Sequence, residues 1–192
     1  MQREALIADL VRGRRVLDVG SLGQSADYCL WKMIDREAAS LMGIDLPDAQ
    51  QTARALLQIP EAGLQHHQDP RIVLGNMETV DLGMRFEVVT AGDVIEHVSN
   101  PGGFLDNIYR HLEHDGRLII TTPNAKWPTV FLKPNLTHVL WHDRYTLNQL
   151  LIRHGFELEL LRYYLGNKPR YAWWQKPLLI RQQLFAVARR GR

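Results

Sequence analysis

The chain has 192 residues and a formal net charge of +2, with 45% hydrophobic and 23% charged residues. This length and composition indicate one globular domain over residues 1–192 and exclude a fibrous or disordered chain. A single cysteine, Cys29, excludes an internal disulfide and a cysteine-rich zinc site. The sequence contains no apolar stretch typical of a signal peptide or a membrane-spanning helix, so we expect a cytoplasmic protein.

The charge is unevenly distributed along the chain. From Arg162 to Arg192 there are eight Lys and Arg residues and no acid, whereas the rest carries 15 basic and 21 acidic residues. A basic C-terminal segment over residues 166–192, ending in the last strand, is therefore expected. A solvated basic terminus explains it most simply, and an anionic partner is the alternative.

Helical and extended patterns alternate from the N-terminus onward. Residues 1–13 contain a short helix over 4–12, and a buried strand over 15–19 follows. Further helices are expected over 24–35, 47–58, 101–113 and 146–154, and further strands over 40–45, 71–74, 86–91, 117–121, 156–164 and 182–189. Residues 124–142 form an irregular stretch that we expect to lie over the strand ends, where a substrate would bind. The alternation predicts a largely parallel sheet with helices on both faces, and ligands then bind beyond the carboxyl ends of its strands.

Small and polar residues follow the first two strands. Gly20 and Ser21 open a tight turn, which lets backbone N–H groups approach a ligand, although a plain strand-to-helix turn has the same pattern. Asp45 ends the strand over 40–45. Its carboxylate suits the two hydroxyls of a ribose, or else stabilises a helix N-terminus.

The next two strands are followed by residues of more varied chemistry. Asn76 and Met77 offer an amide and a soft apolar surface that could contact a nucleotide base. In the alternative interpretation Asn76 belongs to a turn and Met77 to the core. Asp93, Glu96 and His97 place three ionisable groups within five residues at the end of an apolar strand. Such a cluster favours a functional site over packing.

Five motifs in this order resemble a class I S-adenosylmethionine-dependent methyltransferase. They are Val16-Leu17-Asp18-Val19-Gly20, Gly43-Ile44-Asp45, Asn76-Met77-Glu78, Val94-Ile95-Glu96-His97-Val98 and Gly116-Arg117-Leu118-Ile119-Ile120-Thr121-Thr122-Pro123-Asn124. Within that superfamily the chain is most similar to the ubiquinone-biosynthesis type of small-molecule O-methyltransferase. The resemblance implies an α/β fold: a Rossmann-like, doubly wound, seven-stranded sheet, mostly parallel with an antiparallel last strand.

The resemblance also assigns residues to the cofactor S-adenosyl-L-methionine. Its methionine part would lie against Asp18, Gly20 and Ser21, its ribose against Asp45 and Leu46, its adenine against Asn76 and Met77, and Gly92 would face it from the fourth strand. The first loop departs from the family pattern, because Leu22 and Gln24 stand where glycines are usual and Gly23 lies between them. Asn76 likewise stands where an aspartate is common.

Methyl transfer to a hydroxyl needs an aligned acceptor and a base, because the cofactor itself carries the activated methyl group. His97 is the best placed base, Asp93 and His138 are further catalytic candidates, and His142 is an alternative. Asp93, Glu96 and His97 also match an acid-x-x-Glu-His pattern with which some relatives bind a divalent metal. A local structural role for Glu96 and His97 is the competing interpretation, and we expect no metal.

The expected acceptor is a small molecule or glycan that carries a hydroxyl group. Trp173 and Trp174 in the basic segment offer contact with a membrane surface, a lipid-linked acceptor or a second copy of the chain, and otherwise pack against the sheet. A nucleic-acid methyltransferase is an alternative because of the basic end, but the chain lacks the Asn/Asp-Pro-Pro-Tyr/Phe motif of amino-directed enzymes. A non-catalytic S-adenosylmethionine-binding protein is a further alternative, because the first loop departs from the family pattern.

Overall fold

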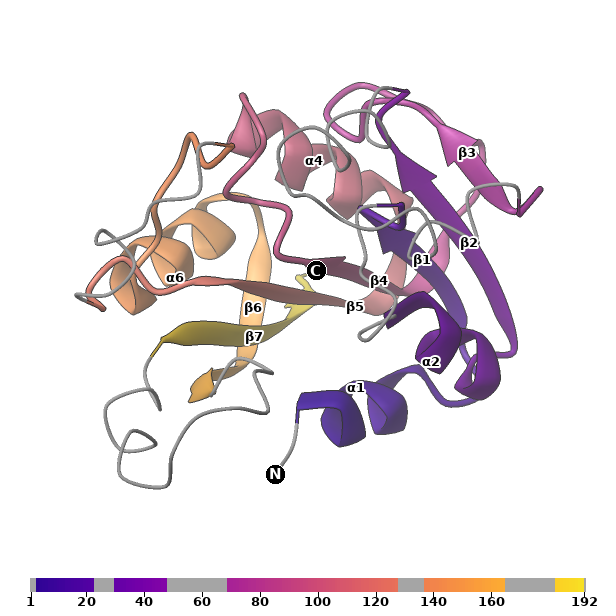
Figure 1. Ribbon diagram of the computed structural model, residues 1–192, viewed down its shortest axis with the longest axis horizontal. Helices are drawn as coiled ribbons and strands as arrows, with labels where there is room; N and C mark the ends of the chain where they lie inside the picture. Colours follow the sequence, from indigo (N-terminus) through magenta and orange to yellow (C-terminus); the bar gives the residue numbers. More distant parts are fainter. Residues whose placement is uncertain (1–2, 23–29, 48–68, 128–136, 165–181, 192) are drawn as a thin grey trace.

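The computed structural model describes residues 3–22, 30–47, 69–127, 137–164 and 182–191. These residues form a seven-stranded sheet in the order β3-β2-β1-β4-β5-β7-β6 (Figure 1). The strands are β1 Arg15–Val19, β2 Ser40–Asp45, β3 Ile72–Leu74, β4 Phe86–Gly92, β5 Leu112–Pro123, β6 Phe156–Tyr164 and β7 Gln183–Arg190. The helices are α1 Arg3–Val11, α2 Leu30–Glu37, α4 Pro101–His111 and α6 Arg144–Arg153.

The strand pairing confirms the predicted fold class. β1 is parallel to β2 and β4, β2 to β3, and β4 to β5. β7 is antiparallel to both β5 and β6, so it alone runs against the others. The chain steps outward from β1 to β3 and then returns to β4, which places the switch point of the sheet between β1 and β4.

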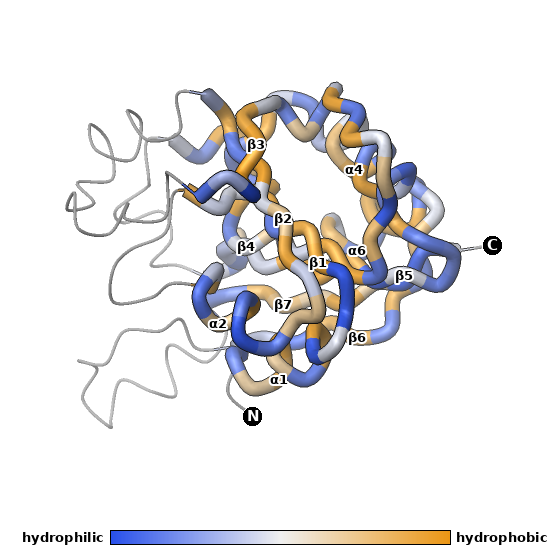
Figure 2. Tube along the Cα trace, turned by 90° about the vertical axis from the view of Figure 1, so that its right-hand side faces the viewer, coloured by the Kyte–Doolittle hydropathy of each residue, from blue (hydrophilic) through white to orange (hydrophobic). Residues whose placement is uncertain are grey.

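Helices cover the two faces of the sheet and enclose two apolar clusters. One cluster joins α1 and α2 to the sheet through Ile7, Val11, Trp31 and Ile34. The other joins α4 and α6 to it, with Phe104, Leu105, Ile108, Leu147 and Leu151 fully buried. Figure 2 shows the apolar residues gathered along the central strands. Because both faces are covered, the carboxyl edge of the sheet is left for a ligand.

Some element boundaries differ from the predicted ones. β5 begins at Leu112 rather than residue 117, because Leu112 pairs with Phe86 before a register shift in β4. The dipeptide Asp115-Gly116, which is typical of turns, therefore lies inside the strand, where Asp115 has a φ of 61°. α2 is described from Leu30 onward. The first part of the helix over 24–35, the helix over 47–58 and the Trp173-Trp174 pair lie outside the described residues. None of the described helices combines the length and the apolar composition needed to cross a membrane.

Candidate functional site

The turn after β1 is so tight that it requires glycine. Gly20 has a φ of +81°, and a Cβ at this position would lie 2.5 Å from Cγ2 of Val94. A side chain would therefore be strained as well as blocked. The Ser21 hydroxyl is buried and donates to the carbonyl of Asp18 at 2.7 Å, so it is held within the turn itself.

Gly43 on β2 provides the space for this turn. A Cβ on Gly43 would lie 2.5 Å from Ser21 Oγ and 2.6 Å from Cζ3 of Trp31. A glycine inside a strand often marks such a close approach, and Gly43 is paired directly with Asp18 of β1. The Gly43-Ile44-Asp45 motif thus shapes the turn after β1 as well as its own strand end.

Asp45 fixes the loops after both strands. Its Oδ2 accepts a hydrogen bond from Leu22 N at 2.6 Å, and its Oδ1 accepts one from Leu46 N at 2.8 Å. The Leu22 side chain is buried, with 1% of its surface exposed. A leucine is therefore accommodated where the family usually has a glycine, because its side chain enters the core while its N–H binds Asp45. Gly23 and Gln24 lie outside the described residues.

Two further predicted cofactor residues have their side chains inside the protein. Asp18 is fully buried, and its Oδ1 accepts a hydrogen bond of 2.6 Å from the Thr90 hydroxyl of β4. Met77 is 4% exposed and belongs to the apolar cluster beneath α4. Asn76 lies beside it at the end of β3, where its Oδ1 accepts from Glu78 N at 2.8 Å. The cofactor roles of these residues remain predictions.

The end of β4 brings together charged groups that are distant in sequence. Asp93 has a left-handed φ of 56°, its N–H donates to Thr121 O at 2.9 Å, and its Oδ1 accepts from the Thr121 hydroxyl at 3.2 Å. Arg3 of α1 lies over the same strand end. Its Nη1 is 3.6 Å from Asp93 Oδ2, and a Cβ on Gly92 would lie 3.0 Å from its Nη2. The switch point thus carries both a carboxylate and a guanidinium.

Sequence reasoning missed Arg3 as a functional residue. Its Nη1 donates to the Tyr164 hydroxyl at 3.1 Å, and the guanidinium lies 5.3 Å from the centre of the Tyr164 ring. These contacts join the first helix to the end of β6 across 161 positions, and no local pattern indicates them. The Arg3 side chain is only 8% exposed, so a full positive charge is held at the carboxyl edge beside Gly92.

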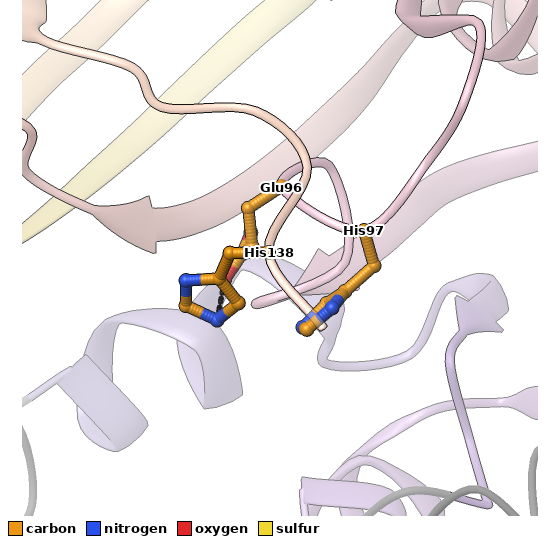
Figure 3. A group of neighbouring side chains, drawn as sticks. All are labelled: Glu96, His97 and His138. Carbon is orange, nitrogen blue, oxygen red and sulfur yellow. Dashed lines mark ion pairs between the residues drawn. The ribbon is translucent and has the colours of Figure 1, made fainter. Parts of the chain in front are cut away.

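Glu96, His97 and His138 meet where the loop after β4 contacts the loop before α6 (Figure 3). Val139 N and Leu140 N donate to the Glu96 carbonyl at 2.9 and 3.1 Å, which docks the second loop on the first. The rings of His97 and His138 are 4.7 Å apart, edge to face. This pairing brings the two predicted catalytic histidines together, whereas the Asp93 carboxylate bonds to Thr121 instead.

Burial controls the charge of this group. Glu96 is 1% exposed, and burial, together with the charge of Asp93, raises the pKa of its carboxyl well above the ordinary value of 4.5. Its Oε2 accepts from the Thr122 hydroxyl at 2.9 Å. Burial and the neighbouring His97 lower the pKa of His138 to about 4. Both shifts favour the neutral form of the group, and Glu96 Oε1 lies 4.0 Å from His138 Nε2.

The same three side chains form a set that could hold a divalent cation. One ligand atom from each of Glu96, His97 and His138 lies within 4.8 Å of the others. Glu96 Oε1 and His138 Nδ1 are buried and accept no hydrogen bond from the described residues. Nitrogen and carboxylate donors suit a transition metal or zinc. Asp93, which the sequence pattern included, is not a member of this set.

The segment after β5 forms the other side of the carboxyl edge. Ala125 N donates to His142 O at 2.8 Å, and His142 is buried, which lowers the pKa of its imidazole. Beside this segment is a cavity of about 380 Å³, lined by Lys126 and by residues of α6 and β6 that include Arg144 and Tyr163. Its volume is in the range of small-molecule sites. His142 is not a member of the set formed by Glu96, His97 and His138.

The fold is that of an open α/β sheet with its switch point between β1 and β4, the place where such sheets bind ligands. A family profile described as a methyltransferase domain matches residues 2–161. The chain therefore belongs to the methyltransferase domain family, which confirms the class that its motifs predicted.

Curated relatives agree with this family. The chain is 31% identical over 131 residues to the ubiquinone biosynthesis O-methyltransferase of Rhodopseudomonas palustris strain TIE-1, which covers 68% of the chain and 48% of the relative. The enzyme of the same name from Nitrobacter winogradskyi is 31% identical over 130 residues, covering 68% of the chain and 46% of the relative. The chain thus matches about half the length of these relatives.

Solved structures share the fold. An S-adenosylmethionine-dependent methyltransferase from Mesorhizobium loti superposes with a TM-score of 0.64 and 17% identity, covering 94% of this chain and 93% of that one. The N-methyltransferase NodS of Bradyrhizobium japonicum, in complex with S-adenosylhomocysteine, has a TM-score of 0.65 and 12% identity, covering 99% and 86%. At these identities the likeness concerns the fold alone.

Proposed function

We propose that the chain transfers a methyl group from S-adenosylmethionine to the hydroxyl group of a small-molecule or sugar acceptor. The observation that carries the proposal is the hydrogen bond of His97. Its Nδ1 lies 3.0 Å from the carbonyl oxygen of Thr137, which can only accept, so Nδ1 carries the hydrogen. In the neutral imidazole Nε2 then keeps a lone pair, and this is the atom that takes the acceptor's hydroxyl proton.

The cofactor side follows from the strand ends. Gly20 would let the backbone approach the methionine part, and the Asp45 carboxylate at the end of β2, which holds Leu22 N and Leu46 N, would accept the ribose hydroxyls. Arg3 offers its guanidinium to the cofactor's carboxylate beside Gly92. The bound cofactor supplies the methyl group on a positively charged sulfur, which loses its charge during transfer.

The acceptor side is formed by the loop that carries His138. His138 is neutral at neutral pH, so it leaves the acceptor hydroxyl without a competing charge. Its ring lies 5.1 Å from that of Trp141, and both rings offer apolar surface to an acceptor. The O-methyltransferase names of the curated relatives support a hydroxyl acceptor.

Turnover on a panel of phenols, sugars and amines, followed through the release of S-adenosylhomocysteine, tests this proposal. We expect hydroxyl acceptors to react and His97→Asn to lower kcat by about 10² to 10⁴. Asparagine is the matched variant because its side-chain N–H can still donate to Thr137 O, while no basic nitrogen remains. Reaction with amines only, or an unchanged kcat in His97→Asn, contradicts the proposal.

A further inference from the structure

The turn over residues 75–82, which follows β3, contains hydrogen bonds that fix its shape. Thr79 N and Val80 N both donate to Asn76 O, at 3.0 and 2.9 Å. Glu78 N donates to Asn76 Oδ1 at 2.8 Å. Bonds within a turn do not fix the orientation of that turn relative to the sheet. The strand before the turn, β3, has three residues and lies at the edge of the sheet. Contacts with another element must therefore set that orientation.

Those contacts come from Asn107 on α4. Its amide nitrogen donates to Met77 O at 2.9 Å and to Val80 O at 2.7 Å, so both of its hydrogens are used. Asn107 is 3% exposed and lies between Phe104 and Ile108 on the buried face of the helix. A leucine of similar volume would suit that apolar face. The asparagine is stable there because its two carbonyl partners satisfy it.

His111 holds the far end of the same turn. One helical turn after Asn107, its Nε2 accepts from Leu82 N at 3.0 Å, and its Nδ1 lies 2.8 Å from Asn107 O. An N–H can only donate and a carbonyl can only accept, so the ring is neutral with its hydrogen on Nδ1. Ser99 N adds a bond of 3.0 Å to Glu78 Oε1 just before α4 begins. α4 and the residues just before it therefore fix the turn at several points. The bond from Asn107 to Met77 lies nearest to the start of the turn.

We propose that Asn107 is a positioning residue for the adenine base of the cofactor. This inference rests on the proposed function, in which Asn76 and Met77 contact the base. Asn107 binds the carbonyl of Met77 directly and so fixes the backbone on which both residues stand. The bond from Glu78 N determines which end of the Asn76 amide is oxygen, and Asn107 determines where that amide lies relative to the sheet.

A fixed amide can distinguish two bases that a mobile amide cannot. Adenine carries a donor at C6 and an acceptor at N1, whereas hypoxanthine carries an acceptor and a donor at these places. An amide held in one place and orientation suits only the first pattern, while one whose backbone can shift away from the base distinguishes neither pattern. Base selectivity is therefore the property that Asn107 controls, beyond any effect on folding.

The test measures binding of S-adenosylhomocysteine and S-inosylhomocysteine, which has hypoxanthine as its base, by calorimetry to wild type and Asn107→Leu. We expect wild type to prefer the adenine ligand by about tenfold or more, and Asn107→Leu to bind the two within about twofold of each other. Ile108→Val is the matched control, because it loosens the same helix face without removing a hydrogen bond to the turn. It should keep the wild-type ratio.

The inference is overturned if folded Asn107→Leu keeps the wild-type ratio, or if Ile108→Val loses the ratio equally. If Asn107→Leu does not fold, Asn107→Gln is measured in its place, because it keeps the amide but displaces it by one methylene. The inference is then overturned if folded Asn107→Gln keeps the wild-type ratio, or if Ile108→Val loses the ratio equally. If wild type binds neither ligand, the proposed function fails. If wild type binds both ligands with equal affinity, the inference about Asn107 fails alone.

Discussion

Asp45 has two roles in this account, and substitution separates them. Asp45→Ala removes the acceptor of two backbone bonds, from Leu22 N at 2.6 Å and Leu46 N at 2.8 Å. Hydrogen bonds to a charged group contribute about 1.5 to 3 kcal/mol each. Asp45 is half-buried, so water replaces part of that contribution. We expect the free energy of unfolding to fall by about 2 kcal/mol and the Tm by about 4 to 8 °C.

The cofactor role of Asp45 adds a separate loss. Two hydrogen bonds from the ribose hydroxyls, at about 1.5 kcal/mol each, correspond to about 100-fold in affinity. Calorimetry with S-adenosylhomocysteine and its 2′,3′-dideoxy analogue isolates this contribution as a double-mutant cycle. Wild type should bind the analogue about 100-fold more weakly than the parent ligand, and Asp45→Ala should bind the two alike. If Asp45→Ala discriminates between them as wild type does, Asp45 supports the loops only, and the ribose assignment is wrong.

Three further predictions concern the same strand ends. Gly20→Ala should lower the free energy of unfolding, measured in a urea titration, by about 2 to 4 kcal/mol. The alanine would have a left-handed backbone conformation, and its Cβ would clash with Val94. A loss below about 0.5 kcal/mol would contradict the tight turn. The pKa of Glu96 is raised in the folded state, so its contribution to stability is complete below pH 4.5 and decreases as pH rises. Urea titrations should therefore show Glu96→Gln gaining stability over wild type between pH 5 and pH 8, and a constant difference would mean that Glu96 is ionised in the fold. Turnover should survive treatment with EDTA, because the raised pKa of Glu96 favours its protonated form, which needs no cation, and activity that is lost and then restored by added Zn²⁺ would instead assign a metal to Glu96, His97 and His138.

The strands of the sheet could be predicted because each one is encoded in a short, local pattern of residues. Short runs such as those over 15–19 and 40–45 are apolar on both faces and flanked by turn residues, which is typical of buried parallel strands. The predicted start of β5 was wrong because Asp115-Gly116, a dipeptide typical of turns, lies inside an irregular strand. Pairing of Leu112 with Phe86 across the sheet decides that boundary, and this pairing leaves no periodic pattern in the sequence.

The site was predicted less completely because its contacts join distant segments. The residue types at the strand ends predicted a ligand site at the carboxyl edge, and Gly20, Asp45 and Gly92 lie at that edge in the structure. The position of Arg3 depends on Tyr164, and the position of His138 depends on the carbonyl of Glu96. Asn107 is one polar residue on an apolar helix face, which was the only signal of its contacts with the turn after β3.

Binding of S-adenosylhomocysteine to the wild-type chain tests the central claim most directly. The account predicts a single site with a Kd below about 100 μM in a calorimetric titration, in the range of working enzyme affinities. It also predicts protection of the turns that contain Gly20 and Asn76 from hydrogen exchange when the ligand is bound. The absence of heat and of protection at millimolar ligand, with a folded chain, would contradict the account.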